Sequence, residues 1–406
     1  MKNDHIKILL TWLLGFCLVI LSGCKPIDTE VDDSQKYFIS LGEFTTYDEA
    51  DAFKSKIDFE LWCELKIKQI EEKRFVLLYG SFNSSFDAGE KGFELYSNSL
   101  VSNYKILKEN NYIRDDFSNF VFIGKYQGRQ SIFNYNLVSQ KTKQVWSRWG
   151  RKVVTLNHAF DRGEIFFTTA LGFGKQGTFP YIRDARLYTY RSANDVFEEI
   201  EEFGTGLQIY TYWENTDTFK VNFTQPDSID SNIIVQEIFP YDLSGKRGTG
   251  FTRRFNLAGE GFPKPPQIKP EYFSPSAKRQ IREVIQDGES FLYLRDIDKN
   301  SELLVYQSNG KLQDIRWTKN SNFAVCSLIN PKSNKGFELI VIDCSSNKNA
   351  KTFYSSEYIN SLVHGNLLFF EEKSVYGSVI SIYNFEKDTI INKISMPGGC
   401  AIFNLK

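Results

Sequence analysis

The chain has few of the side chains on which enzyme active sites usually depend. Its 406 residues include three His and six Cys, and no two Cys have the CxxC spacing of a redox or zinc motif. It also contains no GxSxG nucleophile elbow and no GxxxxGK[ST] phosphate loop. We therefore expect no metal, no cofactor and no enzymatic activity.

An excess of charge of one sign is also missing. Lys and Arg total 49 and Asp and Glu total 50, so the formal net charge is −1. A nucleic-acid-binding domain carries a clear basic excess. Thus the composition predicts no nucleic-acid partner, while a glycan or a protein partner remains compatible with it.

Long apolar runs are missing everywhere except near the N-terminus, in ILLTWLLGFCLVIL at 8–21. Lys2 and Lys7 precede this run, and Leu21-Ser22-Gly23-Cys24 completes it. A positive start, a short apolar core and small residues before a cleavage site are typical of a signal peptide. The alternative is an uncleaved transmembrane anchor, but 14 residues are few for a span.

The segment Leu21-Ser22-Gly23-Cys24 resembles the lipobox of bacterial lipoprotein signal peptides. This resemblance implies removal of residues 1–23, attachment of lipid (palmitate among the acyl chains) to Cys24, and anchoring to a membrane of the cell envelope. The polar, acidic residues 24–35 would then form a tether between the lipid and the first domain.

The other cysteines are expected to be structural. Cys17 would be removed with the signal peptide, which leaves Cys63, Cys326, Cys344 and Cys400. Because Cys is often buried as a small apolar side chain, we expect buried free thiols rather than disulfides.

A short phrase occurs twice, as GEFTTYDEA at 42–50 and GSFNSSFDA at 80–88. Each copy follows an apolar run, and a glycine would release the chain from the sheet before a Ser/Thr helix cap and an acidic first turn. The expected order is βαββαβ, a split unit of ferredoxin-like type in an α+β domain. The expected helices are 47–57 and 86–101, and the strands between and after them are 61–71 and 102–107.

This duplicated strand–Gly–x–Phe–helix phrase resembles the SPOR (sporulation-related repeat) family, over about 36–112. The resemblance implies binding of septal peptidoglycan glycan strands stripped of their peptides. Family members place Gln, Arg or other polar residues where this chain has Ser40, Val76 and Leu78, which are therefore the candidate glycan-binding positions. Either this more apolar face packs on the next domain, or glycan binding is lost or moved, or the domain is a scaffold without a sugar site.

Residues 117–406 change to short strand-like runs separated by turns. An alternating strand ending in an aromatic residue or Ile recurs six times, at intervals typical of propeller blades, so we predict an all-β propeller of six blades. A pair of β-sandwiches is the alternative. Residues 400–406 could pair with 119–126 and close the ring. The six phrases are IFNYN (132–136), RLYTYR (186–191), EIFPYDLSG (237–245), LLVYQSNG (303–310), LIVIDCSSN (339–347) and ISIYNFEKD (380–388).

The turns SPSAKR (274–279) and WTKNSN (317–322) resemble those before the second strand of blades in six-bladed propellers of the periplasmic Tol type. His158 and His364 are interpreted as turn histidines, since a catalytic role demands a positioned partner. Aromatic clusters are interpreted as blade core, with Trp213 as the best candidate for an exposed sugar platform.

Together these patterns predict a lipid-anchored, non-enzymatic cell-envelope protein. Its SPOR-like domain would bind peptidoglycan glycan, and its propeller would bind a protein partner. Two alternatives stay open: an exported propeller enzyme that acts on polysaccharide, and an assembly lipoprotein that binds only proteins.

Overall fold

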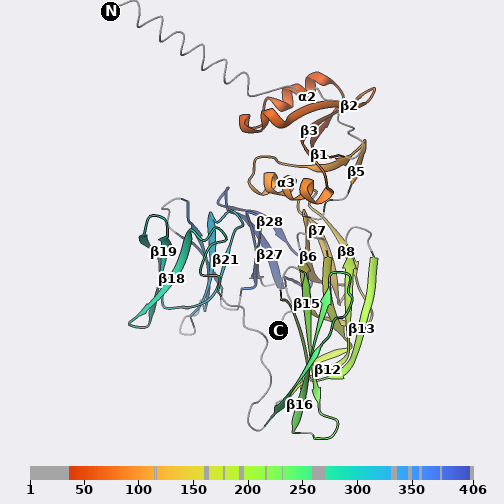
Figure 1. Ribbon diagram of the computed structural model, residues 1–406, viewed down its shortest axis with the longest axis vertical. Helices are drawn as coiled ribbons and strands as arrows, with labels where there is room; N and C mark the ends of the chain where they lie inside the picture. Colours follow the sequence, from red (N-terminus) through yellow and green to blue (C-terminus); the bar gives the residue numbers. More distant parts are fainter. Residues whose placement is uncertain are drawn as a thin grey trace, which may run out of the picture. The chain divides into compact units, whose positions relative to one another are not determined.

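The computed structural model describes residues 36–402 except 114, 116, 160–163, 177–178, 192–195, 215–216, 231, 258–269, 331–335, 346–349, 356–358 and 375–376. The chain divides into two compact units (Figure 1): unit 1 is Met1–Gly92 with Asn103–Arg114, and unit 2 is Phe93–Ser102 with Asp115–Lys406. The predicted signal peptide, Cys24 and the tether lie outside the described residues. Within the described part, no helix has the length and apolar character needed to cross a membrane.

Unit 1 has the expected βαββαβ order, with a further strand at its end. Its sheet is antiparallel and has the order β2-β3-β1-β4-β5. The first four of these strands have the order of a ferredoxin-like sheet. The elements are β1 (Tyr37–Phe44), α2 (Tyr47–Lys54), the 3₁₀ helix η2 (Phe59–Glu64), β2 (Leu65–Glu71), β3 (Arg74–Phe82), α3 (Ser85–Ser97), β4 (Lys105–Lys108) and β5 (Asn111–Ile113).

Several boundaries of the expected elements 47–57, 61–71, 86–101 and 102–107 differ in the structure, and the two helices end early, at Lys54 and at Ser97. Residues 61–64 were expected to begin a strand, but they belong to η2, because the Asp58 side chain caps that turn by accepting a hydrogen bond from the Glu60 amide at 3.1 Å. The last expected strand, 102–107, is reduced to β4, and the chain then turns at Glu109, which has a φ of 54°, to form β5.

The duplicated phrase forms two equivalent joints between a strand and a helix. A Cβ at Gly42 would lie 2.7 Å from the Phe44 ring, and one at Gly80 would lie 2.6 Å from the Phe82 ring. In each copy the phenyl ring therefore folds back over the glycine two residues before it, which leaves no room for a side chain there.

Both joints also carry the expected helix caps. Thr46 accepts a hydrogen bond from the Glu49 amide at 3.2 Å, and Ser84 accepts one from the Asp87 amide at 3.0 Å. The two acids complete the arrangement, because each also accepts a hydrogen bond from a Thr or Ser hydroxyl near the helix start. The repeated sequence thus encodes a repeated local structure.

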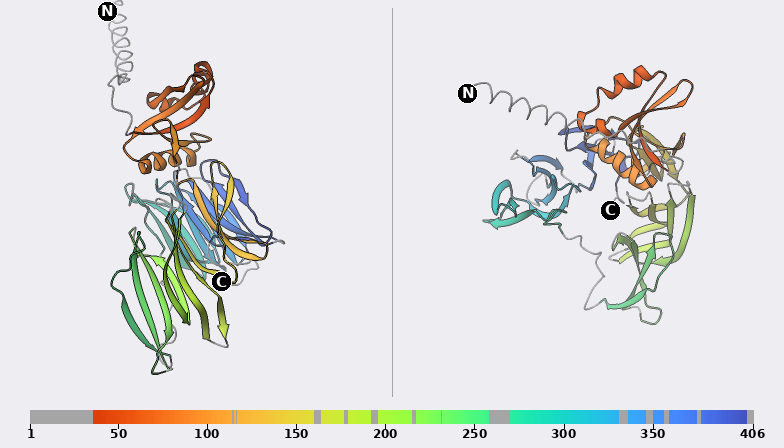
Figure 2. Two further views of the ribbon diagram at one scale, coloured as in Figure 1. Left: turned by 90° about the vertical axis from the view of Figure 1, so that its right-hand side faces the viewer. Right: turned by 45° about the horizontal axis from the view of Figure 1, so that its top comes forward.

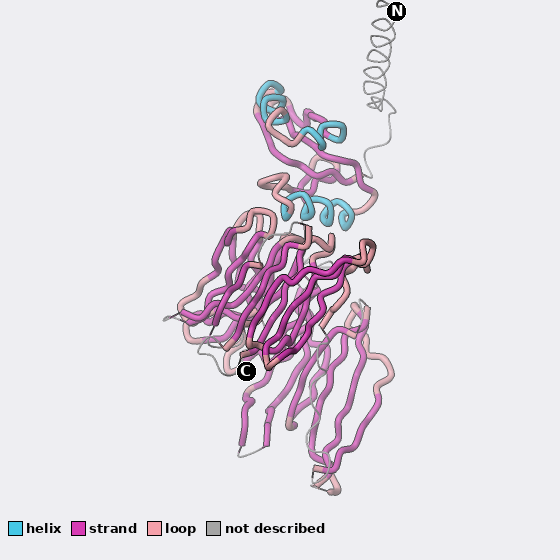
Figure 3. The backbone as a smooth tube through the Cα atoms, turned by 90° about the vertical axis from the view of Figure 1, so that its left-hand side faces the viewer, coloured by secondary structure: helices cyan, strands magenta, loops and turns pink. Residues whose placement is uncertain are grey.

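Unit 2 consists of six antiparallel sheets, which we number as blades 1 to 6. Helices, drawn in cyan in Figure 3, occur in the described chain only before residue 98. Blade 1 is β29-β6-β7-β8, and blades 2 to 6 take the remaining strands in chain order. The strands are β6 (Asn119–Tyr126), β7 (Arg129–Asn136), β8 (Lys141–Trp146), β9 (Lys152–Ala159), β10 (Glu164–Ala170), β11 (Gly172–Gln176), β12 (Phe179–Arg191), β13 (Val196–Gly206), β14 (Gln208–Trp213), β15 (Thr218–Pro226), β16 (Ile233–Asp242), β17 (Phe251–Asn256), β18 (Arg279–Gln286), β19 (Glu289–Asp296), β20 (Ser301–Ser308), β21 (Lys311–Trp317), β22 (Phe323–Ile329), β23 (Phe337–Asp343), β24 (Lys351–Ser355), β25 (Ser361–His364), β26 (Leu367–Ser374), β27 (Gly377–Asn384), β28 (Thr389–Ile394) and β29 (Cys400–Ala401).

The ring closes as the sequence predicts, through the C-terminal strand. Cys400 pairs with Gly124 and Ala401 with Ile123, so that β29 becomes the first strand of blade 1. The last and first blades also pack face to face, with the rings of Phe369 and Phe120 stacked at 4.3 Å. The blue and yellow strands of these two blades lie side by side in Figure 2. A β-propeller follows from six successive sheets and this closing strand.

The blades bury their faces against one another in large apolar clusters. One cluster joins blades 1 and 2, another joins blades 2 and 3, and two more join blades 4 and 5 and blades 5 and 6. The largest fully buried side chains are aromatic, among them Tyr188, Tyr241 and Phe166. Radial packing of this kind buries the two apolar faces that a single antiparallel sheet cannot bury alone.

The recurring sequence phrase marks the third strand from the inner edge in five blades, namely β7, β12, β16, β23 and β27. Blade 4 is the exception. The turn before β18 corresponds in sequence to the turn before β22, which is the second strand of blade 5. In addition, Phe273 forms an antiparallel β-bridge with Gln280 on the inner side of β18. Thus β20, which carries LLVYQSNG, corresponds to the fourth strand of the other blades and not to the third.

We expect Ala401→Asp to weaken unit 2 strongly. Ala401 is fully buried between β6 and the core shared by blades 1 and 2. An unpaired carboxylate there would cost at least about 3 kcal/mol of unfolding free energy. Urea unfolding of this variant should be compared with Lys141→Asp, which is at an exposed position of β8 in the same blade. Equal stability of the two variants would argue against closure by β29.

Candidate functional site

The first candidate surface is the face of the unit 1 sheet that lies opposite α2. Helix α2 covers the other face, where the Phe53 ring lies 5.2 Å from Phe44 and the Tyr47 ring lies 6.3 Å from Phe75. Since side chains alternate along a strand, the register places a second set of side chains on the opposite face. That set includes an apolar strip made of Phe38, Val76, Leu78 and Leu107.

The structure brings the three predicted glycan-binding positions together on this face. Ser40 pairs directly with Leu78, and Val76 is the next residue of β3 that points the same way. Their exposed fractions are only 3%, 3% and 0%. A ligand on this face would therefore contact the side chains around them, and the glycan role itself stays a prediction.

Cationic side chains surround the apolar strip. Lys66 pairs with Leu78, Lys68 with Val76, and Lys105 with Ser40, so the three lysines share the face of the strip. We call Lys66, Lys68, Arg74 and Lys105, together with Glu43, Glu71 and Tyr112, the basic face.

One carboxylate organises part of the basic face. Glu43 accepts a hydrogen bond from Arg74 Nε at 3.0 Å and lies 3.7 Å from Lys105 Nζ. Glu71 lies 3.4 Å from Arg74 Nη1. The Tyr112 hydroxyl, followed by Arg74 and Lys105, holds the pKa of Glu43 below its usual range. Glu43 is therefore ionised at neutral pH and binds two of the four cations.

Tyr112 is the functional candidate that sequence reasoning missed, because it belongs to the unpredicted strand β5. Its hydroxyl lies 3.2 Å from Ser40 Oγ, and its ring centroid lies 4.6 Å from Lys105 Nζ. Burial, followed by the neighbouring Glu43, raises the pKa of Tyr112. The sequence YKILKENNYI could have indicated β5, because it reads as two short strands joined by a two-residue turn at 109–110.

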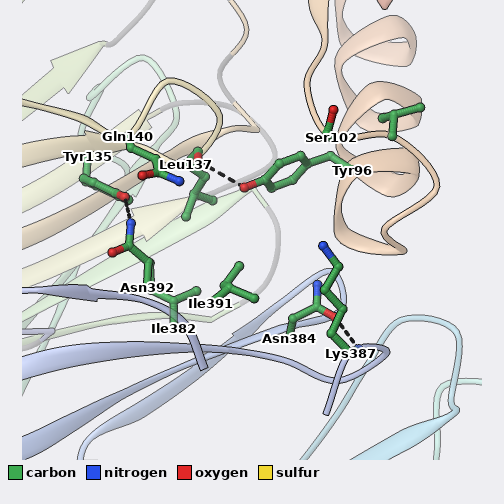
Figure 4. A pocket seen from close by; sticks show the side chains of 11 residues that line it. Tyr96, Ser102, Tyr135, Leu137, Gln140, Ile382, Asn384, Lys387, Ile391 and Asn392 are labelled. Atoms are coloured by element: carbon green, nitrogen blue, oxygen red, sulfur yellow. Dashed lines mark hydrogen bonds between the residues drawn. The ribbon is translucent and has the colours of Figure 1, made fainter. Parts of the chain in front are cut away.

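The second candidate is a cleft of about 330 Å³ in unit 2 (Figure 4). Residues 96–102 form one side, and the ends of strands in blades 1 and 6 form the other. Asn392 donates a hydrogen bond to the Tyr135 hydroxyl, and the Tyr96 hydroxyl donates one to the carbonyl of Leu137 at 3.0 Å. The lining residues are Tyr96, Val101, Ser102, Tyr135, Leu137, Gln140, Ile382, Asn384, Lys387, Ile391 and Asn392.

The side chains of this cleft offer hydrogen-bonding groups and aromatic rings to a ligand. Burial raises the pKa of Tyr135 to about 12 and also raises that of Tyr96, so both phenols stay neutral. The 11 lining residues include no His, Cys, Asp or Glu. Amides, hydroxyls, aromatic rings and Lys387 remain to contact a ligand.

The end of α3 is held in unit 2 by a set of specific contacts. The Phe93 ring stacks on His364 at 4.2 Å, and Asn384 Nδ2 donates to the carbonyl of Ser97 at 3.1 Å. A Cβ at Gly365, whose φ is +56°, would lie 2.7 Å from the Phe93 ring. This glycine is thus required both by its backbone conformation and by the close approach of the ring.

The two histidines lie in strands and not in turns, contrary to their interpretation as turn residues: His158 pairs with Ile165 in β9, and His364 pairs with Leu367 at the end of β25. His364 Nε2 is 2.9 Å from the carbonyl oxygen of Phe117. Burial lowers the pKa of His364 to about 4. Burial, and then the charge on His364, lowers the pKa of His158 to about 3. Both rings are therefore neutral at neutral pH.

Trp213 is not an exposed sugar platform. Its ring packs edge to face against Phe166 at 5.7 Å and Phe219 at 5.3 Å, in the cluster between blades 2 and 3. The polar residues that follow it in sequence suggested exposure, but the register with Phe219 directs its ring into the core.

The described cysteines are free thiols. Cys326, Cys344 and Cys400 are buried as expected, whereas Cys63 is exposed. Among the described residues, no group of three or more His, Cys, Asp or Glu is arranged to hold a metal ion.

Comparison with known proteins found no matching family model and no matching curated protein. Among solved structures, the chain is similar to TolB from Acinetobacter baumannii, with 14% identity, a TM-score of 0.41, and coverage of 84% of this chain and 81% of that chain. It is also similar to putative TolB from Agrobacterium tumefaciens (12% identity, TM-score 0.29, 64% and 87% covered) and to an oligogalacturonate lyase in complex with manganese (8%, 0.28, 69% and 82%). All three TM-scores are below 0.5, so the propeller assignment depends on the sheet topology and the closing strand.

The buried histidines predict a loss of stability in mild acid. Between about pH 6.5 and pH 4 the unfolded chain takes up protons on His158 and His364 that the folded chain does not, so the unfolding free energy should fall as the pH falls. Chemical unfolding at pH 7, 6 and 5 measures this slope. The double variant His158→Gln/His364→Gln should show a shallower decline, and an unchanged slope would contradict the assignment.

Proposed function

We propose that the protein is a lipid-anchored, non-enzymatic component of a bacterial cell envelope. In this proposal unit 1 binds peptidoglycan glycan and the propeller binds a protein partner. The observation that carries it is the pair of Gly–x–Phe joints with capped helices, set in a ferredoxin-like sheet whose other face is built as a polar rim around an apolar strip.

The face opposite α2 has the features of a surface for an extended polysaccharide. All five strands of the sheet contribute to it, so it is broad enough for a chain rather than a single small molecule. Tyr112 offers an aromatic ring to the apolar side of a sugar, and the surrounding cations and carboxylates offer partners for hydroxyl and amide groups. The candidate positions Ser40, Val76 and Leu78 support this surface from below.

The propeller supports a role in protein binding. Its blades present strand ends and turns on a scaffold of packed sheets, an arrangement that commonly carries binding residues. The cleft between the end of α3 and blades 1 and 6 holds hydrogen-bonding groups and aromatic rings, so a peptide segment of a partner is a suitable occupant. The competing function, an assembly lipoprotein that binds only proteins, predicts no affinity for glycan.

A pull-down on peptidoglycan tests the glycan role. Residues 25–406 should be retained roughly tenfold better on sacculi whose peptides an amidase has removed than on intact sacculi, because stripping exposes the glycan. Retention is measured by quantifying bound protein after washing. The variant Lys141→Gln, altered on an exposed part of blade 1, should be retained like the parent. Equal, low retention on both kinds of sacculi would leave only the protein-binding alternative.

Lipid attachment has its own test. In bacterial cells, Cys24→Ala should abolish incorporation of labelled palmitate and move the protein from the detergent phase to the aqueous phase, because the thiol is the proposed acceptor. Cys17→Ala is the matched control, since it lies within the predicted signal peptide and should leave labelling unchanged. Continued labelling of the Cys24→Ala chain would contradict the lipobox assignment.

A further inference from the structure

We propose that the basic face of unit 1 selects glycan that carries carboxylates. The carboxylates in question are those that an amidase leaves on the lactyl groups of muramic acid when it removes the stem peptides. This inference rests on the proposed glycan function and adds to it the chemical group that is recognised.

The first argument is charge. The basic face contains four cationic side chains and two carboxylates, so its net charge is +2, whereas the whole chain has a net charge of −1. Both carboxylates contact Arg74, the first at 3.0 Å and the second at 3.4 Å. Lys66 and Lys68 lie on the edge strand β2, and neither takes part in these ion pairs with Glu43 and Glu71. An anionic ligand is the complement of such a surface.

The second argument is placement. Lys66 and Lys68 point to the same face from positions two residues apart, so their attachment points lie roughly 7 Å apart along β2. Lys105 lies on β4, on the other side of the strip, about 14 Å from β2 across three strand spacings. The strip itself is buried and apolar. A sugar chain lying along it would thus have cations on both sides.

The third argument concerns Glu43. This carboxylate contacts Arg74 and Lys105 from within the protein, in the way that a ligand carboxylate would contact them from outside. Tyr112 stays neutral, since burial and Glu43 raise its pKa, so it adds no competing negative charge. A neutral polysaccharide would offer no anionic partner to Lys66 and Lys68, whereas a carboxylate-bearing one would pair with them directly.

The experiment compares two forms of one ligand. Residues 25–406 are bound to amidase-stripped glycan, and to the same glycan after its carboxylates have been converted to neutral amides. We expect binding to the amidated form to be roughly tenfold weaker, and binding to the carboxylate form to weaken as salt rises from 50 to 300 mM, since roughly two exposed charge contacts are involved.

Two variants test which residues of the basic face cause the difference in binding. Lys66→Gln/Lys68→Gln should bind the carboxylate form roughly tenfold more weakly than the parent does, and should bind the amidated form with little change. Its matched control is Lys141→Gln/Lys143→Gln, which also removes two lysines two residues apart on an edge strand. Glu43→Gln should bind the carboxylate form more tightly, by roughly twofold to fivefold, because it frees Arg74 and Lys105.

The outcomes separate this inference from the function beneath it. Equal binding to the carboxylate and amidated forms overturns the carboxylate selection and leaves glycan binding intact. No binding to either form overturns the glycan function and the selection with it. Tighter binding to phosphatidylglycerol vesicles than to stripped glycan also overturns the proposal, and assigns the basic face to a lipid surface. Thermal melting of each variant shows whether a loss of binding comes from unfolding.

Discussion

The second unit depends on one short pairing, between Cys400–Ala401 and Ile123–Gly124. Every other described strand of the propeller pairs with strands near it in sequence, so each blade is a local structure, and this pairing joins the last part of the chain to the first blade. Around it, Ser378 donates a hydrogen bond to the carbonyl of Cys400, and Glu371 accepts one from the amide of Ile402. The last blade therefore secures the strand that completes the first.

Closure also determines where unit 2 can bind other molecules. The pairing of β29 with β6 helps to bring blades 1 and 6 side by side, and the cleft of Figure 4 lies at the turn ends of these two blades. The residues 93–102 complete the cleft through Tyr96. The side chains that line it come from three separate parts of the chain, which explains why no sequence motif marks it.

In unit 1 the two faces of the sheet have different roles, one in packing against α2 and the other in presenting charged side chains. The face under α2 packs aromatic rings from the Gly–x–Phe joints, whereas the other face keeps an apolar strip dry beneath a rim of charged side chains. The rim is where any ligand would make contact, since the side chains at the centre are buried. Glu43 and Glu71 pair with Arg74, and Tyr112 of β5 contacts Ser40. These contacts determine which charged side chains of this face remain available to a ligand.

Local patterns in the sequence determined the joints, the caps and the repeated strands, because hydrogen bonds between residues two to four apart and side-chain alternation depend on neighbours in the chain. They also determined the closing strand, whose apolar residues match those of β6. Only the tertiary structure decided the contents of the basic face, because Tyr112 reaches Ser40 from 72 positions further along the chain. The inward direction of the partly buried Trp213 and the place of β18 in blade 4 depend on shorter pairings, with Phe219 and through Phe273, because the residue pattern alone does not fix how such neighbouring segments pair.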